Sequence, residues 1–319
     1  MLSDEKPEVV AICTPNTTHA SQTIAAAKAG VRGVYCEKPM ATCMRDAREM
    51  VEACRQAGVV LVVNHIRRVL PDLVEARSLI ESGAIGEVKL IRADNAGDIL
   101  SDGSHSIDSV LHFVGDRPAE WVLGQIHRWK PGLVPPIPQS GQGRPFGGFR
   151  YGHAVEAGGT AIIQIKDGPR VELACGDMHV AGRAYQDYEI HGTLGTIWRT
   201  GDTAKPNLFI SDAAGGSWQA GMEGGWNYKP VQTAGGKGMW RPVATPDQHA
   251  LVFAEGYQLF AKSIREGCPN PMNGDNAIRG FEIVMAVYES ARLNRKLYLP
   301  IAQDKFPLDL MIEAGRFEK

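Results

Sequence analysis

The N-terminal part of the chain alternates short apolar runs with stretches of helical periodicity. Residues 9–13, 31–36 and 59–63 are apolar without polar alternation, the pattern of strands covered on both faces. Between these runs, apolar positions at helical spacing predict one helix that ends at Gly30 and a second helix over 44–57. Strand, helix, strand, helix, strand with short connections predicts a parallel α/β sheet with right-handed crossovers.

The pattern changes after Asn64, where helical stretches are followed by segments in which apolar and polar residues alternate. Such alternation is typical of half-exposed strands in an open, mostly antiparallel sheet. We therefore expect two domains, with a boundary near residues 64–70. The predicted helices are 70–82, 102–114 and 278–295, and the predicted strands are 86–93, 161–165, 170–174, 188–191, 195–199 and 296–300. Residues 132–158 and 215–238 are expected to be long loops, rich in Gly, Pro and aromatic residues.

Composition excludes several classes of protein. A net charge of -2 gives no basic field that would attract nucleic acid or an anionic membrane. No apolar run reaches the roughly 18 residues that a membrane-spanning helix needs, and the first residues lack the features of a signal peptide. The cysteine and histidine spacings match no zinc motif, so we expect no metal site, and the sequence as given favours a cytoplasmic location.

Several short motifs then occur in a fixed order. Thr14-Pro15-Asn16 with His19 follows the first predicted strand, and Glu37-Lys38-Pro39 follows the second. GAIGEV at 83–88, GSHSID at 103–108, EIHGTLGTIWR at 189–199 and AIRGFEIVMAVYESARLNRKLYLP at 277–300 come later. Each motif is weak alone, but together they resemble the glucose-fructose oxidoreductase / inositol dehydrogenase family (Gfo/Idh/MocA) over nearly the whole chain.

The resemblance implies a fold and a cofactor. Residues 1–66 would be the C-terminal part of a dinucleotide-binding Rossmann domain, and residues 67–319 an α+β domain for substrate binding and oligomerisation with one large, mostly antiparallel sheet. NAD or NADP would bind between them. A Rossmann domain begins with a strand, a G-x-G-x-x-G turn and a helix, and nothing before Val9 supplies these. We expect that the sequence is incomplete at its N-terminus; a natural short form that has lost cofactor binding is the alternative.

The resemblance also assigns acid–base chemistry to Lys38 and His105. A partly desolvated lysine beside a nicotinamide cation has a lowered pKa and can help to deprotonate a substrate hydroxyl. In the family, an aspartate four residues before the histidine commonly completes this set. Here that position is Ser101, and the nearest carboxylate is Asp102. Either Asp102 substitutes for that aspartate, or Lys38 and His105 work without it.

The remaining candidates follow from position. Strand ends in open α/β sheets bind ligands, although Thr14 and Asn16 could instead only form a turn, and Arg68 a structural salt bridge. Five further residues on loops or strand ends are suited to grip a sugar, but nothing in the sequence selects among them: His179, Arg183, Tyr185, Trp226 and Trp240. The expected cofactor contacts are Thr14, Pro15, Asn16, His19, Glu37, Lys38, Pro39, Asn64 and Arg68; the expected catalytic residues are Lys38, Asp102 and His105; the expected substrate contacts are Lys38, Asp102, His105, Asp108 and His153.

Three functions are compatible with these residues. The main hypothesis is an NAD(P)-dependent oxidoreductase that acts on a secondary hydroxyl, or the matching ketone, of a sugar, cyclitol or glycoside. The second is an NAD-dependent glycosidase that works by oxidation and elimination, and the third is a non-catalytic ligand sensor on the same fold. The partners would be a small carbohydrate-like molecule and further copies of the chain, as a homodimer or homotetramer packed through the open face of the large sheet.

Overall fold

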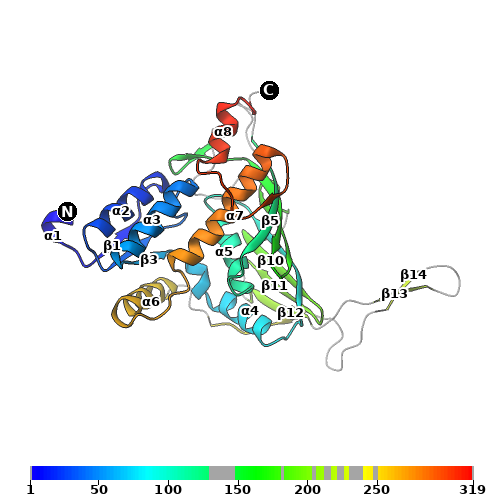
Figure 1. The fold of residues 1–319 in the computed structure, drawn as a ribbon. Coiled ribbons are helices and arrows are strands. Elements are labelled where there is room, and N and C mark those ends of the chain that lie inside the picture. The colour runs from blue at the N-terminus through cyan, green and yellow to red at the C-terminus, as the bar shows by residue number, and fades with distance from the viewer. Residues whose placement is uncertain are drawn as a thin grey trace.

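Two sheets of different size organise the chain (Figure 1). The structure is a computed structural model that describes residues 2–128, 148–180, 183–202, 206–211, 217–220, 226–229, 240–246 and 251–317. A three-stranded parallel sheet lies in the N-terminal part, drawn in blue, and a nine-stranded, mostly antiparallel sheet lies in the part that follows. The α/β class and the order of the two sheets confirm the fold expected from the sequence.

The small sheet consists of β1 (Val9–Ile12), β2 (Gly33–Cys36) and β3 (Val60–Val63), all parallel. The central strand β2 is buried along its whole length, as its unbroken apolar run predicts. The expectation of burial on both faces is wrong for β1, where Val9 is 47% exposed. Among the described residues β1 pairs only with β2, so it lies at the edge of this sheet.

Helices cover both faces of the small sheet. Val34 and Cys36 pack into the main core with α2 (His19–Lys28) and α3 (Met44–Ala57), which ends at Gly58 in the left-handed conformation. Tyr35 points the other way and packs edge-on against Phe260 of α6 (Val252–Glu266), with ring centroids 5.4 Å apart. Thus a helix from the C-terminal part of the chain covers this face of the small sheet. The predicted division at residue 66 stays a prediction.

The large sheet has the strand order β15-β12-β11-β10-β4-β9-β8-β5-β16. Only β4 and β9 are parallel neighbours. All six strands predicted in this part of the chain are confirmed, whereas β5, β12 and β15 were not predicted. The bounds are β4 Val88–Asn95, β5 Ala119–His127, β8 Gly158–Ile165, β9 Arg170–Gly176, β10 Gln186–Gly192, β11 Thr196–Thr200, β12 Leu208–Ser211, β15 Arg241–Pro242 and β16 Leu297–Tyr298.

Helices α4 (Pro71–Glu81), α5 (Gly103–Phe113) and α7 (Gly274–Leu293) lie along one face of this sheet (Figure 1). Every residue of α5 is buried, because the helix is enclosed by the sheet, α4 and α7. The Asn273 side chain caps α7 by accepting a hydrogen bond from Asn276 N at 2.9 Å. A Cβ on Gly124 would lie 2.6 Å from the Val287 carbonyl oxygen, so α7 packs directly on the backbone of β5.

Short elements complete the described chain. The predicted loops 132–158 and 215–238 fall largely outside the described residues, but their described parts contain strand pairs rather than loop alone. None of the described helices is both long and apolar enough to cross a membrane. The short elements are α1 (Leu2–Glu5), η1 (Asn16–Thr18), η2 (Ile66–Val69), β6 (Phe149–Arg150), β7 (His153–Ala154), β13 (Ser217–Ala220), β14 (Trp226–Lys229) and α8 (Pro307–Glu313).

Candidate active site

Three loops meet at one edge of the small sheet. They follow β1, β2 and β3, and the carboxyl ends of parallel strands lie at the same edge, where ligands bind in open α/β sheets. Asn64 Nδ2 donates to Glu37 Oε1 at 2.7 Å, which joins the second loop to the third. The two ring nitrogens of buried His19 lie 2.9 Å from the carbonyl oxygens of Thr14 and Pro39, which joins the first loop to the second. His19 therefore connects the loops rather than facing outward.

The first loop has an unused donor that fits a cofactor. Asn16 is buried, and its Nδ2 has no hydrogen-bond partner among the described residues. A buried amide group without a partner is costly unless a ligand or water completes it. Thr14 and Pro15 are exposed beside it. This edge of the sheet can thus hold the nicotinamide-ribose side of a dinucleotide.

Lys38 extends from the second loop toward the N-terminal end of α5. Its Nζ donates to the Ser101 carbonyl oxygen at 2.8 Å and lies 4.0 Å from Asp102 Oδ1. Burial lowers the pKa of Lys38 below its ordinary value, and the carboxylate of Asp102 opposes this shift only in part. Lys38 can therefore lose its proton more readily than a surface lysine.

His105 lies in the first turn of α5, on the other side of the domain junction. Burial holds its pKa well below the ordinary value, and the nearby cation of Lys38 acts in the same direction, so the imidazole is neutral at pH 7. Its Nδ1 has no partner among the described residues. The ring stands edge-on to that of His65, with centroids 5.6 Å apart.

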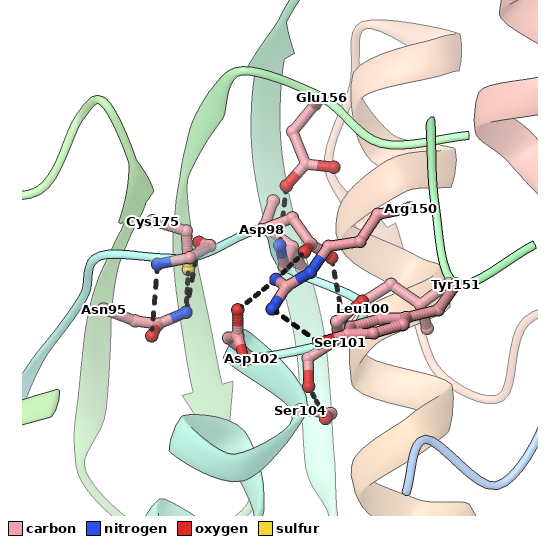
Figure 2. Close-up of polar contacts among 12 residues, drawn as sticks. Asn95, Asp98, Leu100, Ser101, Asp102, Ser104, Arg150, Tyr151, Glu156 and Cys175 are labelled. Atoms are coloured by element: carbon pink, nitrogen blue, oxygen red, sulfur yellow. Dashed lines mark hydrogen bonds and ion pairs between the residues drawn. The ribbon is translucent and has the colours of Figure 1, made fainter. Parts of the chain in front are cut away.

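A buried cluster of charges supports the turn before α5 (Figure 2). Arg150 Nη1 lies between two carboxylates: it donates to Asp98 Oδ2 at 2.8 Å and makes a short contact with Asp102 Oδ2. Asp98 Oδ1 also accepts a hydrogen bond from Ser101 N at 2.7 Å. His153 Nε2 lies 3.2 Å from Ser101 Oγ. His153 thus reaches the turn that carries Asp102.

Two expected residues pair with each other instead of facing Lys38. The Arg68 guanidinium is fully buried and binds both carboxylate oxygens of Asp108 at 2.8 Å, and Asp116 as well. This is the salt bridge that the sequence left open for Arg68. A buried, bidentate pair is a structural contact, so the geometry does not support a substrate role for Asp108. Arg68 Nη1 has no hydrogen-bond partner among the described residues, so the cofactor role of Arg68 stays a prediction.

The five residues considered for a sugar are dispersed. Arg183 binds Asp187 at 2.9 Å and also Glu189, while His179 Nε2 lies 2.8 Å from the Ala184 carbonyl oxygen. Tyr185 is exposed as a whole residue, but its phenol lies near Asp102: desolvation and then the Asp102 carboxylate raise the pKa of the phenol. Trp240 packs edge-on against Trp198 in the sheet, and the side chain of Trp226 lies outside the described residues.

The sequence did not indicate three residues of the cluster. Asp98 lies four residues before Asp102 and could have been considered, but Arg150 and Glu156 are distant in sequence and belong to no motif. Buried Glu156 accepts hydrogen bonds from Ile99 N and Tyr288 Oη, both at 2.6 Å. Burial and the neighbouring Asp98 raise the pKa of Glu156 to about 7. No group of three His, Cys, Asp or Glu side chains in the described ranges could hold a metal ion.

Comparison with known proteins finds relatives that are named for reactions on sugars or on inositol. The chain is 30% identical over 226 residues to the 1,5-anhydro-D-fructose reductase of Ensifer adhaerens, an alignment that spans 65% of this chain and 61% of the relative. It is 31% identical over 136 residues to the 2,7-anhydro-N-acetylneuraminate hydratase of Escherichia coli, spanning 37% of this chain and 36% of the relative. The chain thus spans less than two thirds of the length of these relatives. The scyllo-inositol 2-dehydrogenase (NADP⁺) of Bacillus subtilis is 24% identical over 93% of this chain and 80% of its own.

Solved structures share the fold. An oxidoreductase domain protein from Kribbella flavida superposes with a TM-score of 0.70 at 20% identity, covering 94% of this chain and 83% of that chain. The WlbA dehydrogenase of Bordetella pertussis, solved in complex with NADH and UDP-GlcNAcA, gives a TM-score of 0.65 at 21% identity over 94% of this chain and 82% of its own.

Two family models match in the order of the two sheets. Residues 1–65 match the oxidoreductase family with an NAD-binding Rossmann fold (GFO_IDH_MocA), and residues 73–198 match the GFO/IDH/MocA C-terminal domain. Together they account for more than half of the chain, and Asn16, Lys38 and the first turn of α5 lie within them. The chain belongs to the Gfo/Idh/MocA oxidoreductase family.

Proposed function

We propose that the protein is an NAD(P)-dependent oxidoreductase that acts on a secondary hydroxyl, or the matching ketone, of a sugar, cyclitol or glycoside. The observation that carries the proposal is the position of Lys38: its ammonium group is largely buried at the carboxyl edge of a parallel sheet and faces Asp102 and the helix of His105. The relatives' names support the class of substrate, since they include an anhydrosugar reductase, a levoglucosan dehydrogenase and an inositol dehydrogenase.

The residues at the edge of the small sheet would hold the cofactor. Asn16 has the free donor, Thr14 and Pro15 are exposed beside it, and Glu37 is fixed by Asn64. A bound nicotinamide ring supplies the hydride chemistry that protein side chains lack.

Lys38 would handle the substrate proton. Because burial lowers its pKa, neutral Lys38 can accept the proton of a substrate hydroxyl while the hydrogen on the carbon leaves as hydride. Asp102 at 4.0 Å then stabilises the ammonium that forms. His105, neutral and with an unpartnered Nδ1, would bind a second substrate hydroxyl or share the proton. In the direction of reduction, the same groups return the proton to the carbonyl oxygen.

A redox-neutral reaction is the second candidate. The 2,7-anhydro-N-acetylneuraminate hydratases among the relatives are named for adding water rather than for a net oxidation. The glycosidase route of oxidation, elimination and re-reduction uses the same first proton transfer to Lys38. The difference would be visible as turnover without net accumulation of reduced cofactor.

The test is a comparison of wild type, Lys38→Met and the matched surface variant Lys28→Met. A panel of 1,5-anhydro-D-fructose, levoglucosan and scyllo-inositol is assayed for cofactor reduction or oxidation and, by mass spectrometry, for product. We expect Lys38→Met to lower kcat by about 10²–10⁴, the usual contribution of a general acid–base group, and Lys28→Met to leave it unchanged.

The outcomes separate the hypotheses. A change in cofactor absorbance that is lost in Lys38→Met supports the dehydrogenase, whereas product without such a change supports the redox-neutral reaction. If Lys38→Met turns over as wild type does, the proposed role of Lys38 is overturned. Saturable binding of a sugar without any turnover would point to the sensor.

We also propose that a second copy of the chain packs on the open face of the large sheet, which gives a homodimer or, with a further contact, a homotetramer. Leu123 and Ile162, paired across β5 and β8, are both more than a third exposed on a face that none of the described helices covers. The cytoplasmic location expected from the sequence stays a prediction.

A further inference from the structure

A short hairpin reaches across the candidate site. It pairs β6 with β7, with Arg150 opposite His153. Its two turn residues, Tyr151 and Gly152, both have positive φ angles of 49° and 89°, as a two-residue hairpin turn of type I′ requires. Residues opposite each other in a hairpin project to the same side. Arg150 and His153 accordingly both contact the 98–102 turn.

Arg150 is the cation shared by the two carboxylates of that turn (Figure 2). The side chains of Asp98 and Asp102 are only 1% and 8% exposed, and that of Arg150 is 12% exposed. Two buried carboxylates so close together repel each other unless a positive charge lies between them. Arg150 provides that charge, and its Nη2 also lies 3.2 Å from Tyr151 Oη.

The same turn fixes Lys38. Asp102 N donates to the Asp98 carbonyl oxygen at 3.1 Å, and the Ser101 carbonyl oxygen accepts from Lys38 Nζ. The position of the Asp102 carboxylate beside Lys38 is therefore set from one side by the turn and from the other by Arg150.

The tip of the hairpin also lies against the first domain. A Cβ on Gly152 would be 3.1 Å from Thr17 Oγ1 and 3.8 Å from Cβ of Pro15, in the loop after β1. The hairpin thus spans from the expected cofactor loop to the N-terminal end of α5. Arg150 is held at the junction of the two domains, where a substrate would lie.

We propose that Arg150 is a positioning residue that holds the Asp102 carboxylate beside Lys38, so that Asp102 takes the place of the carboxylate absent at Ser101. The inference rests on the proposed function. Arg150 acts through the carboxylates and needs no contact with the substrate. Its Nη atoms are already engaged by Asp98, Asp102 and Tyr151.

The loss of Arg150 would change the protonation of this cluster. Without the guanidinium, Asp98, Asp102 and Glu156 face one another with Lys38 as the remaining cation, and one carboxylate takes up a proton at a higher pH than before. If that carboxylate is Asp102, Lys38 loses its partner. The charged and titratable groups that face Asp102 are Lys38, Asp98, Arg150, Tyr185 and Cys175, with Glu156 next to Asp98.

The experiment compares Arg150→Met, Arg150→Lys and the exposed control Arg265→Met with wild type. Initial rates are measured from pH 5 to 10 with the active sugar of the panel. We expect Arg150→Met to lower kcat by about tenfold or more. Arg150→Lys keeps the positive charge but loses the planar guanidinium, so its kcat should lie between those of wild type and Arg150→Met. The KM for the cofactor should change little.

A second readout does not depend on turnover. Side-chain carboxyl signals of ¹³C-labelled aspartate are followed by NMR against pH, with Asp98→Asn and Asp102→Asn used for assignment. We expect one of the two carboxyls to titrate at higher pH in Arg150→Met than in wild type. Arg150→Lys should show a smaller change in the same direction, and it replaces Arg150→Met in this measurement if that variant folds poorly.

Unchanged titration of both carboxyls together with an unchanged kcat would overturn the inference, even if stability falls. A rise in substrate KM alone, at constant kcat, would overturn it too, because Arg150 would then bind the substrate. If Lys38→Met retains turnover, the proposed function fails, while the NMR titration still decides whether Arg150 controls the carboxylate pair.

Discussion

At the scale of single residues, the candidate site is defined by how each buried charge is balanced. Lys38 faces Asp102, and Arg150 lies between Asp98 and Asp102. Glu156 makes no ion pair within the described part of the chain: it accepts hydrogen bonds from Ile99 N and Tyr288 Oη. Burial and then the neighbouring Asp98 carboxylate raise the pKa of Glu156 to about 7, so this carboxyl keeps its proton to a higher pH than an exposed one.

This leads to a prediction for Glu156→Gln. The folded-state pKa of Glu156 is raised above that of the unfolded chain, so its neutral form favours the fold at low pH and this benefit is lost as the pH rises through about 7. Glutamine has the same shape without the charge. We expect Glu156→Gln to raise the free energy of unfolding at pH 8 by about 1–3 kcal/mol relative to wild type and to have little effect near pH 5.

Urea unfolding of both proteins from pH 5 to 8.5 measures this difference, and Glu120→Gln, at an exposed position, is the control. A difference between Glu156→Gln and wild type that stays constant with pH would show that Glu156 does not titrate in this range.

At the scale of helices and strands, the sequence predicted elements whose buried and exposed residues separate cleanly. The unbroken run of β2 and the alternating runs of β8 to β11 are of this kind. Helix α6 was not predicted, because its buried positions include Gly256 and Ser263 while Phe253 and Tyr257 are exposed. Its role in covering the small sheet depends on a tertiary contact with β2 that no local pattern records.

The residues of the candidate site likewise fall into two groups, those that a local sequence motif indicates and those that depend on a long-range contact. Lys38, His105 and Asp102 could be predicted because they belong to local motifs at strand or helix ends. Arg150 could not, since its importance comes from an ion pair with a residue 48 positions away along the chain. No local pattern records such a contact. The pairing of Arg68 with Asp108, 40 positions apart, is a similar case, although the sequence left a salt bridge open.

The packing of α6 on the small sheet gives a prediction for Gly33→Ala. A Cβ at this position in β2 would lie 2.5 Å from Ile264 Cδ1 and 2.7 Å from Phe260 Cζ, both on α6. To make room, either the ends of these two side chains or α6 itself has to shift. We expect a loss of about 1–3 kcal/mol in the free energy of unfolding, as is usual for overpacking.

A double-mutant cycle with Ile264→Ala provides the control, because removing the isoleucine makes room for the new methyl group. The double variant should lose less stability than the sum of the single variants. Simple additivity would contradict the contact between β2 and α6.

At the scale of the whole molecule, the site depends on how the two sheets are joined. Lys38 follows the small sheet, whereas Asp102 and His105 stand beside the large one. Buried ion pairs fix the connecting segment η2 to the large sheet: Arg67 binds Asp202 at 2.6 and 2.7 Å, and Asp202 is shared with Arg199 at 2.5 Å. Such pairs tolerate little displacement, because a separated buried charge is costly.

The open face of the large sheet gives the last prediction, which concerns self-association. Leu123 and Ile162 form an exposed apolar pair, and Glu172, next to Ile162 on β9, binds Arg92 at 2.9 Å. These residues surround a shallow hollow of about 400 Å³. Such a surface, with an apolar centre beside an ion pair, can pack against a copy of itself about a two-fold axis.

A lysine at the centre of such an interface would bury an unpaired charge. We therefore expect Ile162→Lys to lower the oligomeric mass measured by light scattering after size exclusion, while Phe253→Lys, at an exposed apolar position on α6, leaves the mass of wild type. If Ile162→Lys keeps that mass, or if wild type is already monomeric at micromolar concentration, this face does not bind a second copy.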